Sequence, residues 1–352
     1  MDIYAQLDPR AHTSLQLIAE ADDAKKRLEI SELDLFDLSD QQIVELRRFQ
    51  RSEFDVTLGM LERRIDSQAS ETSKVRQAVR DTLSKLNPKP SPIHKALIQL
   101  SNRGVATALA TTNFDLLLED AAQSLGLQTT TSSLGAIPRP GRSREFAGIL
   151  HIHGALKRDP VDPSDLVLSD QDFGESYLRR RMATDFIHDA ARLFNLVLVG
   201  YQANDPPMRY LLNAVAADGL RFPDVRERFV FVGSESIDRV EMQDWRSRGI
   251  TPIWYDSKNS HAALLDTLTR WSQLSAINGE QQVIERTLTS IVNKSVDAAT
   301  DAERDLFDHL VRRGNSRERN RLTRLASKSK PDLGWLDRIV AILREPRGEE
   351  RK

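Results

Sequence analysis

The sequence of 352 residues contains no cysteine. This absence excludes disulfide bonds, thiolate nucleophiles, iron–sulfur clusters and the usual cysteine-based zinc sites. Seven histidines are present, but they show no HExxH spacing, and only His151 and His153 stand close together. We therefore expect chemistry that requires neither a metal ion nor a thiol.

An excess of one charge is also missing. The 50 Lys and Arg residues nearly balance the 52 Asp and Glu residues, so the net charge of −2 creates no field that would attract nucleic acid or a membrane surface. No apolar run approaches the ~20 residues of a membrane-spanning helix, and the N-terminus has no signal-peptide pattern. The hydrophobic share of 39% is typical of a globular protein. We expect a cytoplasmic protein without a membrane partner.

Three regions of the chain differ in pattern. Residues 1–90 are predicted to form a helical N-terminal segment, with Ser39 or Asp40 suited to cap one of its helices. The sequence NPKPSP at 87–92 cannot continue a helix and ends this segment. Residues 276–352 are predicted to form a C-terminal segment of short helices. The apolar positions that indicate the N-terminal helices are Ile43, Leu46, Phe49, Phe54, Leu58, Leu61 and Ile65.

The middle region, residues 91–275, alternates short apolar runs with amphipathic stretches. Such alternation predicts an α/β fold with a doubly wound, mostly parallel, Rossmann-like sheet that carries helices on both faces. The helical segments at the two ends of the chain are additions to this domain. The predicted strands are Val105–Ala110, Gly148–Ile152, Leu166–Leu168, Leu196–Val199, Phe229–Val232 and Pro252–Tyr255.

Polar sequences follow three of these strands. TTNFD follows the first strand, HGALKRD the second and GYQANDPPMRYLL the fourth. Ligands of open α/β sheets bind beyond the carboxyl ends of the strands. Each polar sequence also has a purely structural interpretation: Asn113 and Asp115 can cap the next helix, His153 can be a core histidine, and NDPP can simply begin a helix. Their occurrence at three strand ends favours a shared binding site.

In this order, the three sequences resemble motifs of the sirtuin family, specifically the sirtuin-like NAD hydrolases of bacterial defence proteins. TTNFD is similar to the family's Asn-x-Asp motif, HIHGAL to its His-Gly motif, and LVGYQANDPPMRYLL to a Gly-Tyr-Ser-x-x-Asp turn. GITPIWYD and the helix after it resemble the closing strand and helix, so the resemblance covers residues 93–274. Protein-deacylating sirtuins typically carry a zinc ribbon of four cysteines, which this chain cannot build. The resemblance therefore points to NAD cleavage.

The resemblance implies a catalytic role for three residues. His153 would be the general base that acts on water or on a ribose hydroxyl, because an imidazole with a pKa near ~6.5 suits this role at neutral pH. Asn113 would orient the attacking water and the nicotinamide ribose. Asp115 would fix the loop or interact with the positive charge that develops on the sugar. His151 shares a strand face with His153, so it could support the site or pack against the sheet, and we favour packing.

Six further residues are expected to bind NAD. Two threonine hydroxyls can donate hydrogen bonds to ribose or phosphate, and the glycine after the fourth strand lets the backbone approach the adenosine half. The aspartate of the group can accept a hydrogen bond from a ribose hydroxyl or cap the next helix. These residues are Thr111, Thr112, Gly154, Gly200, Tyr201 and Asp205.

One element of the family pattern is absent. The family's site begins with a strand and a Gly-Ala-Gly-x-Ser loop around the NAD phosphates, whereas Gly59 is the only glycine here before Gly104. Either the chain starts downstream of that loop, or the protein is a degenerate relative that binds nucleotide weakly or not at all. Retention of the three catalytic candidates favours the first explanation. Loss of a central strand would leave its neighbours unpaired.

The sequence thus predicts an NAD glycohydrolase that releases nicotinamide and ADP-ribose. The resemblance implies a role in anti-phage defence by NAD depletion, as a homo-oligomer kept inactive until a trigger or partner engages it. The alternative is a non-catalytic nucleotide sensor or a structural subunit of a defence complex, for example one with a hexameric ATPase. Residues 312–330 hold eight Arg or Lys and one Glu. Such a run is typical of a solvated helix face, and nucleic acid would be at most an indirect partner.

Overall fold

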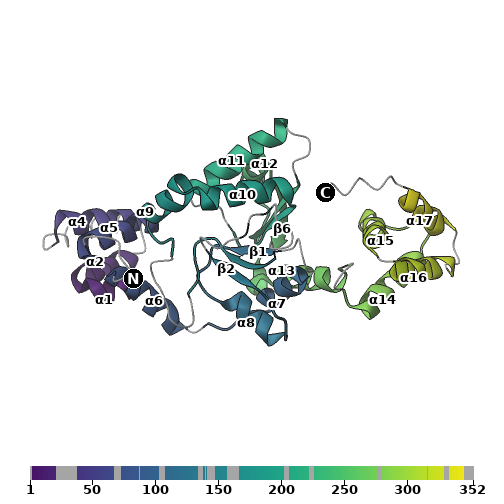
Figure 1. Ribbon diagram of the computed structural model, residues 1–352, viewed down its shortest axis with the longest axis horizontal. Coiled ribbons are helices and arrows are strands. Elements are labelled where there is room, and N and C mark those ends of the chain that lie inside the picture. Colours follow the sequence, from purple (N-terminus) through teal and green to yellow (C-terminus); the bar gives the residue numbers. More distant parts are fainter. Residues whose placement is uncertain are drawn as a thin grey trace. The chain divides into compact units, whose positions relative to one another are not determined.

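The computed structural model of the protein describes most of the chain (Figure 1). The chain divides into two compact units, the first formed by Met1–Ser91 with Ala108–Tyr255 and the second by Pro92–Thr107 with Asp256–Lys352. The N-terminal helices are thus grouped with the sheets, whereas the sequence pattern separates them near residue 90. The described residues are 2–20, 38–66, 73–86, 88–102, 108–133, 138, 140, 147–156, 166–201, 206–221, 226–275, 279–314, 316–328 and 333–344.

The first unit begins with helices that pack on one another. Ser39 caps α4 as expected: its hydroxyl accepts from the Gln42 N–H, and the Gln42 side chain accepts from the Ser39 N–H. Tyr4, Leu46 and Leu61 are buried together at the centre of this group. The helices are α1 (Asp2–Leu7), α2 (Pro9–Glu20), α4 (Asp40–Gln50), α5 (Phe54–Asp66) and α6 (Lys74–Leu86).

The predicted α/β fold is confirmed, with its strands in two three-stranded sheets. The strand orders are β1-β3-β2 and β4-β5-β6, and β1, β2 and β4 each pair in parallel with their neighbour. Within the described residues β1 and β4 are edge strands, although they are the first strands of their sheets in the chain. The strands are β1 (Ala108–Thr111), β2 (Thr131–Ser133), β3 (Gly148–His151), β4 (Leu196–Leu198), β5 (Arg228–Ser234) and β6 (Thr251–Asp256).

Helices cover these sheets through two apolar clusters. Leu150 and Ile152 pack with Tyr177 and other residues of the segment after β3, and Val230 is central to the second cluster on β5. Tyr201 packs against both clusters and so connects them. The elements in these clusters are α9 (Asp170–Phe173), the π-helix η3 (Gly174–Arg179), α10 (Met182–Leu193), α11 (Pro206–Arg221) and α12 (Arg239–Ser247), and α8 (Leu117–Ser124) follows β1 in the chain.

Two strand predictions need correction. The predicted strand Leu166–Leu168 is a buried segment without a strand ladder, because side chains take its polar backbone groups: Arg76 donates to the Leu166 carbonyl, and Asp172 accepts from the Leu168 N–H. The sheet position beside β3 belongs instead to β2. β2 could not be predicted from an apolar run, because it consists of one threonine and two serines.

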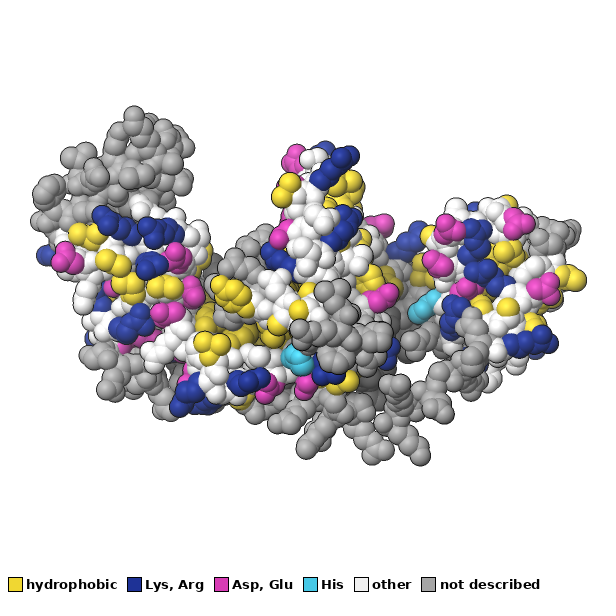
Figure 2. All heavy atoms as spheres, turned by 90° about the horizontal axis from the view of Figure 1, so that it is seen from above, with side chains coloured by type: hydrophobic (Ala, Val, Ile, Leu, Met, Phe, Trp, Pro, Cys, Tyr) yellow, Lys and Arg dark blue, Asp and Glu magenta, His cyan; other side chains and the backbone are white. Residues whose placement is uncertain are grey.

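The second unit contains the expected short C-terminal helices, packed around Phe307 and Trp335. The basic run is partly used within this unit, because Arg319 donates to the Val311 and Arg312 carbonyls at the end of α15. Figure 2 shows basic and acidic side chains interspersed on these helices. None of the described helices has the length and apolar character needed to cross a membrane. The helices are α7 (Pro92–Ser101), α13 (Lys258–Gln273), α14 (Gln281–Val292), α15 (Asp301–Arg313), α16 (Ser316–Ser327) and α17 (Gly334–Arg344).

Candidate functional site

Two of the three polar sequences lie side by side. Parallel pairing places Thr111 of β1 opposite His151 of β3. The contact continues beyond the strands, because the Ile152 N–H donates to the Thr111 carbonyl at 2.9 Å and the Leu156 N–H donates to the Phe114 carbonyl at 2.7 Å. The segments TTNFD and HIHGAL, about 40 residues apart in sequence, therefore share one end of the sheet.

The Asn113 side chain points outward from a fixed backbone. Its N–H donates to Thr111 Oγ1 at 3.1 Å, while its exposed amide has no hydrogen-bond partner among the described residues. Asp115 Oδ1 accepts at 3.1 Å from the N–H of Leu117, the first residue of α8, although the N-cap position itself is Leu116. Asp115 therefore has a structural contact at the start of α8, whereas the Asn113 amide has no such contact among the described residues. Thr112 is partly exposed beside it.

His153 lies in an aromatic enclosure. Its side chain is buried, with a relative exposure of 4%, and Nε2 is 2.7 Å from the Tyr177 hydroxyl oxygen. Phe173 and Tyr177 approach the imidazole edge to face, with ring centroids at 5.2 and 5.9 Å. The next residue, Gly154, has a φ of +92°, which other residues rarely adopt, so a glycine is required at this turn. The enclosure presents the Tyr177 hydroxyl to the imidazole.

His151 does more than pack against the sheet. Its fully buried ring places Nδ1 3.0 Å from the Asn113 carbonyl oxygen and Nε2 2.9 Å from Glu119 Oε1. Burial alone would lower the pKa of His151, but the hydrogen bond and charge of Glu119 outweigh it and raise the pKa above 6.5. Burial raises the pKa of Glu119, and the same partner more than offsets this, leaving that pKa lowered. His151 is buried as the packing interpretation expects, and it also makes polar contacts, as the alternative of supporting the site expects.

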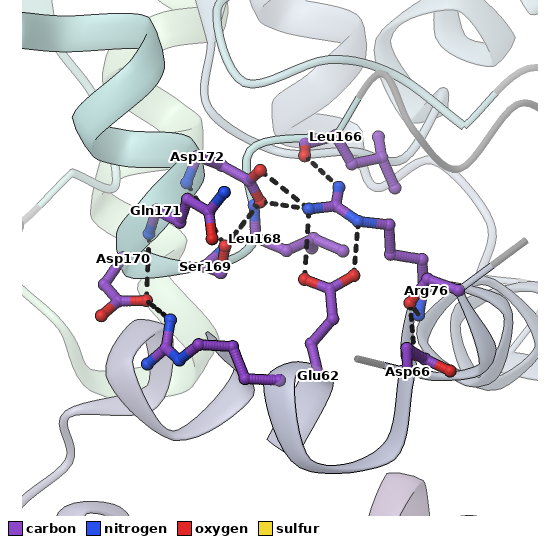
Figure 3. A network of polar contacts seen from close by, with 11 residues as sticks. Glu62, Asp66, Arg76, Leu166, Leu168, Ser169, Asp170, Gln171 and Asp172 are labelled. Carbon is purple, nitrogen blue, oxygen red and sulfur yellow. Dashed lines mark hydrogen bonds and ion pairs between the residues drawn. The ribbon is translucent and has the colours of Figure 1, made fainter. Parts of the chain in front are cut away.

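A buried ionic network supports the enclosure around His153 (Figure 3). Arg76 of α6, with a side-chain exposure of 4%, donates to Glu62 Oε1 at 2.8 Å and to both Asp172 oxygens at 2.7 Å. Asp172 also accepts from the Leu168 and Ser169 N–H groups. These contacts hold Asp172 in α9, one residue before Phe173. They therefore join the N-terminal helices to the enclosure around His153.

The His153 carbonyl extends the same connection. It accepts from the Val167 N–H at 2.9 Å, and Val167 adjoins Leu166, whose carbonyl is held by Arg76. Sequence reasoning missed Arg76, Glu62 and Asp172, because ion pairs over such separations leave no periodic pattern. The only available signal was the Ser169-to-Asp172 spacing, which marks a helix start.

The third polar sequence is described only in part. Gly200, directly after β4, has a φ of +65°, a conformation that favours glycine although a Cβ atom would meet no neighbour there. Tyr201 is partly buried between the two apolar clusters. Asp205 lies outside the described residues. In the part of the chain that the structure describes, no three His, Asp or Glu side chains gather as a metal site would require.

A parallel α/β sheet with polar side chains at its carboxyl end is the arrangement of Rossmann-like nucleotide-binding proteins. A family model described as a SIR2-like domain matches residues 107–253, so this region of the chain is similar to SIR2-like domains. The chain is also 30% identical over 320 residues to the uncharacterized protein y4cA of Sinorhizobium fredii (strain NBRC 101917 / NGR234). That similarity covers 84% of this chain and 24% of y4cA, so the chain spans about a quarter of the length of the curated relative it matches.

Proposed function

We propose that the SIR2-like domain hydrolyses NAD to nicotinamide and ADP-ribose. The observation that carries this proposal is the convergence of two loops: the exposed Asn113 amide stands on the segment that runs beside the His153 turn. Breaking the bond between nicotinamide and ribose develops positive charge on the sugar, and the departing nicotinamide needs no strong acid. The site must therefore bind the ribose, exclude water and position one nucleophile.

The proposed steps use these two side chains. The Asn113 amide binds the nicotinamide ribose and the attacking water. His153 accepts the proton from that water or from a ribose hydroxyl through Nε2, the atom that meets the Tyr177 hydroxyl in this structure. NAD binding replaces the phenol at Nε2 by a ribose hydroxyl or water, so the Tyr177 hydroxyl marks the place of the reacting group. Asp115 holds the loop through the start of α8.

A second candidate function is a nucleotide-binding subunit without catalysis. The burial of His153 and the unpaired outer edges of β1 and β4 in the described residues favour it. Phosphates of a dinucleotide need free backbone N–H groups at a glycine-rich turn, and β1 is followed by threonines instead. The proposed enzyme would instead need a further strand that pairs with β1 and β4, completes the sheet and provides such a turn.

The proposed setting is bacterial defence, with NAD depletion in the cytoplasm as the effect. The resemblance of the motifs supports this setting, and the greater length of y4cA is consistent with a catalytic domain governed by other parts of an assembly. We propose a homo-oligomer, or an oligomer with a partner subunit such as an ATPase, as the active form.

The test is nicotinamide release from NAD. Wild type, His153→Ala and Asn113→Ala would be compared, with His188→Ala on α10 as the matched control because its side chain is 35% exposed. Release that both site variants abolish and the control keeps would support the enzyme. Absence of release in every tested assembly, together with a thermal shift on adding ADP-ribose, would support the non-catalytic subunit instead.

A further inference from the structure

Both ring nitrogens of His151 face atoms that carry no proton. Nδ1 is 3.0 Å from the Asn113 carbonyl oxygen, and Nε2 is 2.9 Å from a Glu119 carboxylate oxygen. A neutral imidazole has only one N–H, so it would leave one of these contacts as two opposed acceptors. With Glu119 ionised, as its lowered pKa favours, the geometry indicates a doubly protonated imidazolium. Its complete burial makes the pairing with Glu119 necessary.

The groups around this imidazolium all favour its charge. Glu119 lies in the first turn of α8, where the helix dipole also favours a carboxylate, and its Oε1 accepts from Thr131 Oγ1 at 2.9 Å. Asp115, in the loop before α8, adds attraction. The titratable group nearest in sequence is His153, two residues beyond the end of β3, and it meets Tyr177. The contacts of His151 and Glu119 thus join β3, the Asn113 loop, α8 and β2.

These contacts fix the Asn113 backbone at both of its polar groups. The N–H donates to Thr111 Oγ1 at 3.1 Å, and the carbonyl accepts from His151. The side-chain amide, which has no partner of its own in the described residues, is consequently directed by the backbone alone. Removal of the imidazolium would free the carbonyl and let the amide change direction.

We propose that protonated His151 is a positioning residue, which holds the Asn113 loop so that the Asn113 amide faces the bound ligand. The positioning role rests on the proposed function, because the bound ligand is the NAD of that proposal. The charge of His151 does not depend on the proposed function. The positioning role goes beyond the family resemblance, which assigns a catalytic role to His153 but none to His151.

The charge can be measured without any enzymatic activity. The full chain would be labelled with ¹⁵N-histidine, and the ring nitrogens followed against pH, with His151→Phe used to assign the His151 signals. We expect His151 to keep both protons well above the unperturbed pKa of ~6.5. Glu119→Gln, which preserves the shape of the partner, should move the titration of His151 back toward that value. A neutral His151 ring at pH 7, or a titration that Glu119→Gln leaves in place, would overturn the proposal.

The positioning role has a separate readout. Glu119→Gln should lower kcat for nicotinamide release by roughly tenfold or more with a smaller change in KM, since a misdirected catalytic group costs rate more than binding. Thermal unfolding of the variant shows whether the fold is intact. An unchanged kcat in folded Glu119→Gln would overturn the role. If the wild type releases no nicotinamide, the proposed function is wrong. The NMR measurement would still determine whether the His151 ring is charged.

Discussion

His151 and His153 stand two residues apart at the end of the same strand, yet their surroundings differ. His151 meets a carbonyl and the Glu119 carboxylate, which bind a charged ring. His153 meets the Tyr177 hydroxyl and the edges or faces of two aromatic rings. Different environments of two titratable groups can separate their roles. The contrast supports our proposals that the first histidine positions the Asn113 loop and that the second is the base.

The sharpest test of this contrast replaces each histidine in turn. His153→Ala should reduce nicotinamide release by roughly 10²- to 10⁴-fold, because that is the usual contribution of a general base. His151→Ala should cost less, since it acts only through the Asn113 loop. Steady-state release of nicotinamide measures both. Equal losses in two folded variants would remove the distinction between the two surroundings.

The Arg76 network should matter to stability more than any surface ion pair. Arg76→Ala leaves Glu62 and Asp172 without their buried cation, and we expect a loss of about 3–5 kcal/mol in the free energy of unfolding. Urea denaturation measures this loss. The matched control is Arg63→Ala, whose partner Asp170 lies at the surface; it should cost about 0–1 kcal/mol. Comparable losses in the two variants would mean that the buried network is not a fixed support.

The same variant also tests which histidine the network serves. The Arg76 contacts reach the start of α9 and hence Phe173 and Tyr177, but no described contact of Arg76 reaches Glu119. Arg76→Ala should therefore disturb the ring signals of His153 and leave those of His151 near their wild-type positions in an NMR spectrum. A disturbance confined to His151 would contradict this separation.

The contribution of the His151–Glu119 pair to stability should depend on pH with a definite sign. The raised pKa of His151 means that its contribution is complete below about 6.5 and is lost as the pH rises through the folded-state pKa. The lowered pKa of Glu119 means that its contribution is complete above about 4.5 and is lost as the pH falls through the folded-state pKa. The difference in unfolding free energy between wild type and Glu119→Gln should thus be largest between these limits and shrink on both sides. A difference that does not vary with pH would contradict the ion pair.

The sequence was sufficient for the fold class because the apolar runs and the helical periodicity are local. It also indicated the strand-end segments, since polar residues directly after an apolar run are visible without a structure. The Leu166–Leu168 prediction was wrong because the partners of its backbone are Arg76 and Asp172, and side-chain partners cannot be inferred from an apolar run. Packing was favoured over support for His151 for the same physical reason: its ring environment comes from Asn113 and Glu119, more than 30 residues away.

The smallest expected effect concerns the contact that closes the His153 enclosure. Tyr177→Phe removes the hydroxyl at Nε2 and should lower the unfolding free energy by about 0.5–1.5 kcal/mol, the net worth of one hydrogen bond. The ring stays in its stack with Phe173, so the enclosure keeps its shape. If the phenol only occupies the place of a ribose hydroxyl or water, nicotinamide release should be unchanged or slightly faster in this variant. A large loss of release in folded Tyr177→Phe would instead make the Tyr177 hydroxyl part of the reaction.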